Sequence, residues 1–201
     1  MKAEGNIHVL KSCALHLISC KHLDIAKING VIMEKHELHY AKPEEASELF
    51  NMYLKKARWF KEKGIDQWDE VYIREYINES RILQLIEEKN YFVLKKDGEI
   101  EAGCILNDDC SKWPKKEENC KYIDYLVSCK ANAGRILIEK LIEHCKQLNV
   151  QKLKLDCQNH NEKLRKYYYE LHFEDAGVVA HKYYPNRYSC LLSLNITQKD
   201  I

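Results

Sequence analysis

The chain has 201 residues, of which 45% are apolar and 31% charged, a balance typical of a globular domain with a sizeable core. Because 32 Lys and Arg oppose 31 Asp and Glu, the net charge is +1, which excludes attraction of nucleic acid or an anionic membrane through overall charge. Only 7 glycines and 3 prolines occur, which argues against disordered and low-complexity classes.

Residues 1–32 are predicted to form an N-terminal extension to a main domain at 33–201. Within the extension, apolar residues recur at helical spacing, and we interpret them as a packing helix with no role in chemistry. Polar residues interrupt this stretch and no small-residue cleavage site follows, so we expect no secretory leader. No run of about 18 apolar residues occurs, so we expect no membrane span.

The next part of the chain predicts a strand, two helical regions and a hairpin. The strand covers 37–41, and the first helix covers 43–63, with Pro43 at its first turn and Gly64 as its stop. A second helical region follows at 69–88. Two β-rich runs then flank Asp97-Gly98 within 91–106, which is the strongest short-range signal for a β-hairpin.

The second half alternates strands and helices. Tyr122, Asp124 and Leu126 are expected on one face of the first strand, because strand side chains alternate. Two strand–helix–strand units imply parallel neighbours, whereas the hairpin implies antiparallel ones, so the fold class is α/β with a mixed sheet. The predicted elements are a strand at 121–128, a helix at 132–148, a strand at 150–157, a helix at 161–173 and strands at 173–180 and 188–196.

The 9 cysteines are scattered, without a CxxC pair. An odd number of irregularly spaced cysteines indicates free thiols in a reducing compartment, so we expect a cytoplasmic protein. Structural zinc usually needs closely spaced pairs of ligands, so we expect no metal site.

The segment "LDCQNHNEKLRKYYYELHF" (155–173) leads from a strand into a helix that carries three consecutive tyrosines. This segment resembles the signature of the GNAT superfamily of N-acetyltransferases, and the resemblance extends over about residues 37–195. His172 replaces the glycine that is usual in the family. The positions that match are Leu155, Cys157, Asn161, Leu164, Tyr167, Tyr168 and Phe173.

The resemblance implies a GNAT-like fold and a site for acetyl-CoA. The fold would be a central mixed sheet of about six to seven strands flanked by about four helices, with parallel strands that splay apart at the cofactor cleft. The coenzyme pyrophosphate would lie at a helix N-terminus, where unpaired N–H groups and the helix dipole favour an anion. The turn "CKANAGR" (129–135) occupies the place of the family's phosphate loop, but it is about three residues shorter and only Gly134 matches outright.

The resemblance also implies roles for single residues. The pantetheine arm would lie along the strand end at 126–128, where a backbone N–H would polarise the thioester carbonyl. Asn161 would bond to the same arm or cap its helix. The residues expected to bind the coenzyme are Leu126, Val127, Ser128, Cys129, Lys130, Ala131, Asn132, Ala133, Gly134, Arg135 and Asn161.

Two residues are expected to carry the chemistry. Tyr168 matches the family's tyrosine, whose hydroxyl donates to the coenzyme sulfur, and a phenol with a pKa near 10 keeps its proton at neutral pH. Asp124 faces the proposed cleft and is a candidate base, which would take a proton from the amine directly or through water, although a hydrogen-bonded or solvated strand residue is the plainer interpretation. We interpret Tyr167 as core, Tyr169 as a rim residue and Cys157 as buried packing.

The amine acceptor is expected to bind beside "GIDQWDE" (64–70). Trp68 would form a wall of that pocket, and Asp69 or Asp66 would hold a cationic substrate, although a loop with one anchoring aromatic residue is the plainer interpretation. The loop that contains Asp108, Asp109 and Trp113 is a further candidate wall, although a solvated turn is the plainer interpretation.

We therefore expect an N-acetyltransferase that moves an acetyl or short acyl group from acyl-CoA to a primary amine, by direct attack in a ternary complex. The alternative is a non-catalytic module that binds acyl-CoA or a protein partner on the same fold. The expected partners are acyl-CoA and a small amine or peptide acceptor, with no nucleic acid and no membrane. The protein is expected to be a monomer or a homodimer.

Overall fold

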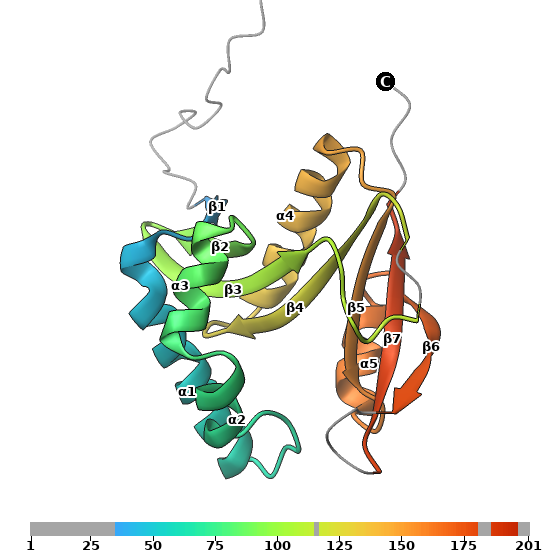
Figure 1. Ribbon diagram of the computed structural model, residues 1–201, viewed down its shortest axis with the longest axis horizontal. Coiled ribbons are helices and arrows are strands. Elements are labelled where there is room, and N and C mark those ends of the chain that lie inside the picture. The colour runs from blue at the N-terminus through green and yellow to red at the C-terminus, as the bar shows by residue number, and fades with distance from the viewer. Residues whose placement is uncertain (1–34, 115–116, 181–185, 197–201) are drawn as a thin grey trace, which may run out of the picture. The chain divides into compact units, whose positions relative to one another are not determined.

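The computed structural model describes residues 35–114, 117–180 and 186–196, and the extension expected at 1–32 lies outside them. The elements follow the order expected from the sequence (Figure 1). They are β1 (His36–Tyr40), the 3-10 turn η1 (Pro43–Glu45), α1 (Ala46–Glu62), α2 (Glu70–Tyr76), α3 (Glu79–Glu87), β2 (Tyr91–Lys96), β3 (Glu99–Asn107), β4 (Cys120–Ser128), α4 (Ala133–Gln147), β5 (Lys152–Gln158), α5 (Glu162–Tyr169), β6 (Glu174–Ala180) and β7 (Tyr188–Asn195).

The strands form one seven-stranded mixed sheet in the order β1-β2-β3-β4-β5-β7-β6, which confirms the predicted α/β fold class. The β2–β3 hairpin around Asp97-Gly98 is present as expected. Strands β4 and β5 pair in parallel, and the other neighbouring pairs of this sheet are antiparallel.

The sequence interpretation is corrected in two places. The second strand–helix–strand unit does not give parallel neighbours, because β7 lies between β5 and β6 and pairs antiparallel with both. The helical region at 69–88 divides into α2 and α3, so the described residues contain five α-helices rather than about four. The division falls at Asn78, which leaves helical geometry and caps α3 by accepting a hydrogen bond from the Arg81 N–H at 3.0 Å.

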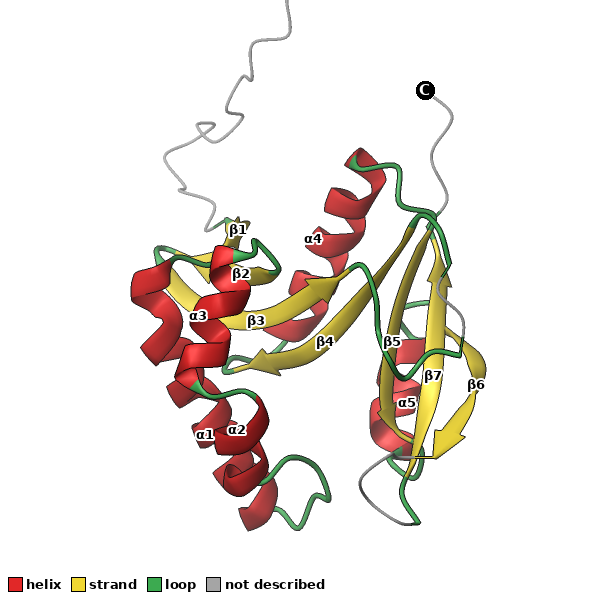
Figure 2. Ribbon diagram, in the orientation of Figure 1, coloured by secondary structure: helices red, strands yellow, loops and turns green. Residues whose placement is uncertain are grey.

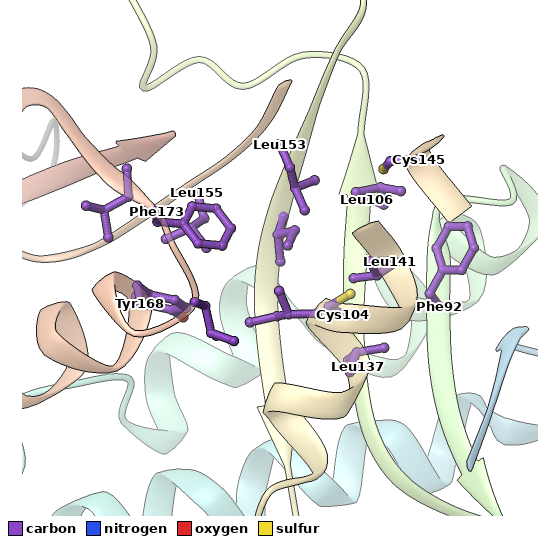
Figure 3. Close-up of a cluster of buried hydrophobic side chains, with 14 of the residues drawn as sticks. Phe92, Cys104, Leu106, Leu137, Leu141, Cys145, Leu153, Leu155, Tyr168 and Phe173 are labelled. Carbon is purple, nitrogen blue, oxygen red and sulfur yellow. The ribbon is translucent and has the colours of Figure 1, made fainter. Parts of the chain in front are cut away.

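Helices cover both faces of the sheet, and each face has its own apolar core (Figure 2). On one face, α4 and α5 contribute Leu137, Leu141 and Tyr168 to a core that reaches Phe92 on β2 and Phe173 (Figure 3). On the other face, α1, α2 and α3 pack on strands β2 to β4. Burial of a large apolar side chain contributes about 1.5–3 kcal/mol, so these two cores hold the strands where the site needs them.

Strand β4 diverges from β5 after a short parallel contact. Their pairing runs only from Cys120 opposite Lys152 to Tyr122 opposite Lys154, and beyond this point the two ribbons separate (Figure 2). This separation is the expected splay of parallel strands.

A β-bulge follows in β4. Asp124 lies opposite Ile105 and Val127 opposite Gly103, so Tyr125 and Leu126 together oppose Cys104. Tyr125 has a φ of 49°, in the left-handed region. The extra residue shifts the alternation of side chains by one. The prediction that Leu126 shares a face with Asp124 is therefore wrong, because Leu126 packs in the core beside α4 instead.

Candidate active site

A cavity of about 860 Å³ lies where β4 and β5 separate. The end of β4, the N-terminus of α4, the start of α5 and the segment between α1 and α2 all line it. Among its lining residues are most of the side chains that the sequence nominated. These are Trp68, Asp69, Asp124, Leu126, Val127, Ser128, Lys130, Ala131, Asn132, Gly134, Arg135, Asn161 and Tyr168.

Two nominated residues do not line the cavity. Cys129 is exposed, and its N–H donates to the Glu101 carbonyl at 2.8 Å, so this N–H is already paired. Ala133, the first residue of α4, is fully buried in the core. These two residues therefore hold the turn before α4 in place, Cys129 through its backbone N–H and Ala133 through its buried side chain.

The N-terminus of α4 offers a place for an anion. Asn132 precedes the helix with a φ of 62°, and its side chain makes no capping hydrogen bond. The first N–H groups of a helix have no partner within it, so this end can donate to a phosphate. Lys130 lines the cavity nearby. Arg135 also lines it, but its guanidinium lies 3.2 Å from Glu170 and over the Tyr167 ring at 5.6 Å.

Close packing surrounds this helix end. A Cβ on Gly134 would lie 3.4 Å from the Tyr167 hydroxyl and 3.5 Å from a methyl of Leu126. Tyr167 was expected only to pack, yet it also lines the cavity. Asn161 caps α5, with its side-chain oxygen accepting the Leu164 N–H at 3.1 Å, and lines the cavity as well.

The three consecutive tyrosines take three different positions. Tyr168 is 7% exposed, lines the cavity and packs edge-on against Phe173 at 5.9 Å between ring centroids (Figure 3). Burial raises its pKa above the ordinary value, so the hydroxyl keeps its proton and can donate. Tyr169 is 38% exposed and donates to Asp175 at 2.8 Å, outside the cavity.

Asp124 lies on β4 in a partly buried position, where its carboxylate accepts a hydrogen bond from Asn107 at 2.9 Å. Burial is the main influence on this carboxyl group and raises its pKa, while Lys112 and the Asn107 bond oppose that rise. Asp156 on β5 adds a further rise. A carboxylate whose pKa is raised is a better acceptor for the proton of an amine.

Asp156 and Lys112 belong to the same cluster, and the sequence reasoning missed both. Asp156 raises the pKa of Tyr168 as well as that of Asp124, so its charge acts on both candidate residues. The alternation of β5 contained a signal for it. Leu155 and Cys157 are apolar and face the core, so Asp156 between them has to face the other side of the strand.

An aromatic wall lies on the α1–α2 side of the cavity. Trp68 packs against Tyr125 at 5.9 Å and Phe60 at 6.1 Å between ring centroids. The hydroxyl groups of Tyr72 and Tyr125 lie 3.0 Å apart. Trp68 therefore lines the cavity together with Tyr72 and Tyr125, which the sequence reasoning did not name.

The carboxylates beside this wall have partners within the protein. Asp69 caps α2 by accepting the Tyr72 N–H at 2.7 Å. Asp66 pairs with Arg187 at 2.7 Å, which joins the α1–α2 segment to the residue before β7. Trp113 lies elsewhere, with its ring 5.8 Å from that of Tyr122.

Cys157 lines the cavity but is 4% exposed, and burial raises the pKa of its thiol to about 12. A thiol that stays protonated is a poor nucleophile. Within the described ranges, no group of three or more His, Cys, Asp and Glu side chains could hold a metal ion. The helices of this part of the chain are too short or too polar to cross a bilayer.

Comparison with known proteins identifies the class. The model of the acetyltransferase (GNAT) family matches residues 48–173. The chain belongs to this family and is an acetyltransferase, as the sequence signature indicated.

Individual relatives agree with this assignment. The chain is 25% identical over 151 residues to an uncharacterized N-acetyltransferase, YesJ, of Bacillus subtilis, covering 70% of this chain and 83% of that protein. A GNAT-family acetyltransferase structure from Listeria monocytogenes matches with a TM-score of 0.59 at 22% identity, covering 80% of this chain and 94% of that one. The structure of yncA from Salmonella typhimurium, a putative acetyltransferase solved with its cofactor acetyl-CoA, matches with a TM-score of 0.60 at 12% identity, covering 83% and 96%.

Proposed function

We propose that this acetyltransferase moves an acetyl group from acetyl-CoA to a primary amine by direct attack in a ternary complex. The observation that carries the proposal is that the α4 N-terminus, which has no side-chain cap, lines the same cavity as Tyr168 and Asp124. This cavity combines a place for a diphosphate, a proton donor and a proton acceptor. The yncA structure, described as holding acetyl-CoA, supports the choice of donor.

The coenzyme would lie along the edge of β4 that β5 leaves unpaired. The diphosphate would accept N–H groups from the first turn of α4, and Lys130 would contribute charge. Ser128 and Asn161 line the path between this helix end and Tyr168, which suits the polar pantetheine arm. Val127 and Leu126 would contact the arm through the backbone.

The amine would enter from the aromatic wall as an ammonium ion. Asp124 and Asp156 bring two negative charges to this region, and Lys112 brings one positive charge, so one further cation balances the cluster. Trp68 and Tyr125 would hold the carbon atoms of the acceptor. Asp69 would contribute only through its negative charge, because its carboxylate already caps α2.

The reaction would then proceed in one bond exchange. Asp124 takes the proton that the ammonium has to lose before its nitrogen can attack. The nitrogen forms a bond to the thioester carbon, the carbon–sulfur bond breaks, and Tyr168 donates a proton to the departing thiolate. The second proton lost by the nitrogen returns through solvent to Tyr168, and Asp124 releases its proton to solvent, so both groups regain their starting protonation states. No acyl-cysteine is needed, since Cys157 stays a buried thiol.

We infer a cytoplasmic location from the thiols. Seven cysteines of the described residues are free, from Cys104 to Cys190, and free thiols persist in reducing compartments.

Calorimetric titration with acetyl-CoA, and separately with coenzyme A, tests the first half of the proposal. We expect micromolar binding of both, followed by release of free thiol when a panel of primary amines is added with acetyl-CoA. Absence of binding up to millimolar concentration would contradict the proposed coenzyme site. Binding without turnover on any amine would support a non-catalytic acyl-CoA module instead.

A further inference from the structure

A chain of tyrosine hydroxyl groups ends on the backbone of the β4 bulge. Tyr53 on α1 and Tyr91 on β2 are both 0% exposed, and their hydroxyl oxygens lie 2.7 Å apart. The Tyr53 hydroxyl also donates to the backbone carbonyl of Tyr125, at 2.6 Å. One fully buried phenol therefore bonds to a carbonyl oxygen of the bulge, and a second fully buried phenol bonds to the first.

The direction of the chain follows from the number of protons. A phenol has one proton to donate. Because Tyr53 uses its proton on the Tyr125 carbonyl, Tyr91 donates to the Tyr53 oxygen. Burial raises the pKa of both phenols, so both protons stay in place.

Strand β3, which pairs with the bulge, leaves room for the Tyr91 ring. A Cβ on Gly103 would lie 3.0 Å from a ring carbon of Tyr91 and 3.2 Å from its hydroxyl oxygen. Gly103 is the residue paired with Val127, at the point where the bulge begins. A glycine there leaves the room that the Tyr91 ring occupies.

The carbonyl that Tyr53 holds determines where a neighbouring donor points. The peptide bond between Tyr125 and Leu126 is planar, and in a trans peptide the C=O and the following N–H point in opposite directions. With the carbonyl directed at Tyr53, the Leu126 N–H is directed away from α1. Leu126 itself lines the cavity at the place where β4 and β5 have separated.

We propose that Tyr53 is a positioning residue for acyl transfer, which fixes the Tyr125–Leu126 peptide so that the Leu126 N–H is aimed at the thioester oxygen. This inference rests on the proposed function. The N–H would stabilise the negative charge that develops on that oxygen as the nitrogen attacks. Such a donor is effective only when it is held in place before the reaction, and a buried hydroxyl on its peptide plane does so.

Two variants that make the same chemical change separate positioning from packing. Tyr53→Phe removes the donor to the Tyr125 carbonyl, whereas Tyr91→Phe leaves that bond intact. Removing an oxyanion donor lowers kcat by about 100- to 1,000-fold, so we expect a donor that is present but misdirected to cost at least about tenfold. Tyr53→Phe should show this fall, with the KM for the amine and the affinity for coenzyme A unchanged. Tyr91→Phe should retain kcat within about threefold.

An equal fall in kcat for both variants would overturn the proposal. So would a fall that follows the loss of thermal stability in each variant, because both results point to general packing of the core.

Nuclear magnetic resonance of the free protein gives a readout that needs no turnover. In Tyr53→Phe, the 13C′ resonance of Tyr125 should move upfield and the Leu126 amide should shift, while Tyr91→Phe should alter both far less. In the wild type, acetyl-CoA should move the Leu126 amide further than coenzyme A does, because only acetyl-CoA carries a carbonyl. If the wild type turns over no amine, the proposed function fails. The positioning is then judged by these shifts alone, and unchanged resonances in Tyr53→Phe would overturn it.

Discussion

The ammonium of Lys112 lies 2.7 Å from the carboxylate of Asp156, an ion pair that ties the segment before β4 to strand β5 beside the cavity. Lys112 also lowers the pKa of Asp124, whereas Asp156 raises it. Two groups of one ion pair therefore act on the candidate base in opposite directions. This relationship makes the pH dependence of the reaction a test of the site.

Substitution of either partner should move the acidic limb of the pH profile in a predictable direction. Asp124 has to be deprotonated to accept a proton, so kcat/KM for the amine should rise with pH through its pKa. Lys112→Met removes a positive charge and should move this limb to higher pH. Asp156→Asn removes a negative charge and should move it to lower pH.

Steady-state kinetics between pH 4 and pH 9 would measure the position of the acidic limb in both variants. Lys61→Met is the matched control, because Lys61 lines the same cavity but is not among the charges that act on Asp124. Shifts of the same sign in both variants would show that Asp124 is not the group that titrates.

The three tyrosines offer a second test. Tyr168→Phe should lower kcat about 100-fold, which is the lower range for general acid catalysis, while the affinity for acetyl-CoA stays nearly unchanged. Tyr169→Phe, at the neighbouring exposed position, should leave kcat within about twofold. Stopped-flow detection of the released thiol would measure both. Full turnover in Tyr168→Phe would exclude the hydroxyl as the proton donor.

Gly134 provides a test in which stability and binding change in opposite directions. Gly134 lies in the first turn of α4, where alanine is favoured over glycine by about 0.5–1 kcal/mol. The new Cβ would make only ordinary contacts with Tyr167, Leu126 and Ser128, at 3.4–3.7 Å. Gly134→Ala should therefore raise the melting temperature.

The same methyl group would obstruct the approach of a phosphate to the helix N-terminus. Losing one phosphate hydrogen bond of about 1.4 kcal/mol corresponds to about tenfold weaker binding of coenzyme A. Ser47→Ala, at an exposed position in α1, is a control that should raise stability without changing this affinity. Unchanged affinity in Gly134→Ala would indicate that the diphosphate binds elsewhere.

Much of the fold was predictable because it depends on short-range patterns. The apolar spacing of α4 and the Asp97-Gly98 turn each specify an element within about 20 residues of sequence, and both appear as expected. The position of β7 between β5 and β6 was not predictable in this way. Strand order depends on which edge a distant strand pairs with, and local periodicity contains no information about that choice.

The candidate site was predictable where a side chain belongs to a strand-to-helix segment. Tyr168 and Asn161 were found from such a segment, and they line the cavity. Leu126 was assigned to the wrong face, because a bulge is set by the pairing of two strands and leaves no mark on alternation. Lys112 comes from an irregular segment, whose approach to Asp156 is a tertiary contact of residues 44 positions apart.

The last prediction concerns the segment that carries Lys112. A buried lysine, Lys154, anchors this segment. The Lys154 side chain is 1% exposed and its ammonium lies 2.6 Å from Glu117. The same ammonium lies 4.2 Å from the centre of the Trp113 ring and 5.5 Å from that of Tyr122. Glu117 also pairs with Lys152 at 2.7 Å.

Glu117→Gln should lower the free energy of unfolding by about 2 kcal/mol, because it leaves a buried ammonium without its counter-charge. This value is at the low end for a buried pair, since the Glu117 side chain is 39% exposed and solvent screens the interaction. Addition of Lys154→Met should recover part of the loss by removing the unpaired charge. Glu118→Gln, at the exposed neighbour, should change stability by less than about 0.5 kcal/mol.

The difference in unfolding free energy between the wild type and Glu117→Gln should depend on pH with a defined sign. Hydrogen bonds, first from Lys152 and then from Lys154, lower the pKa of Glu117 to about 2. The unfolded value is about 4.3, so the stabilisation is complete above that pH and is lost as the pH falls through about 2. Urea unfolding at pH 6 and pH 3 should therefore show a larger gap between wild type and Glu117→Gln at pH 6. An equal gap at both pH values would mean that the carboxylate charge of Glu117 does not hold Lys154 in place.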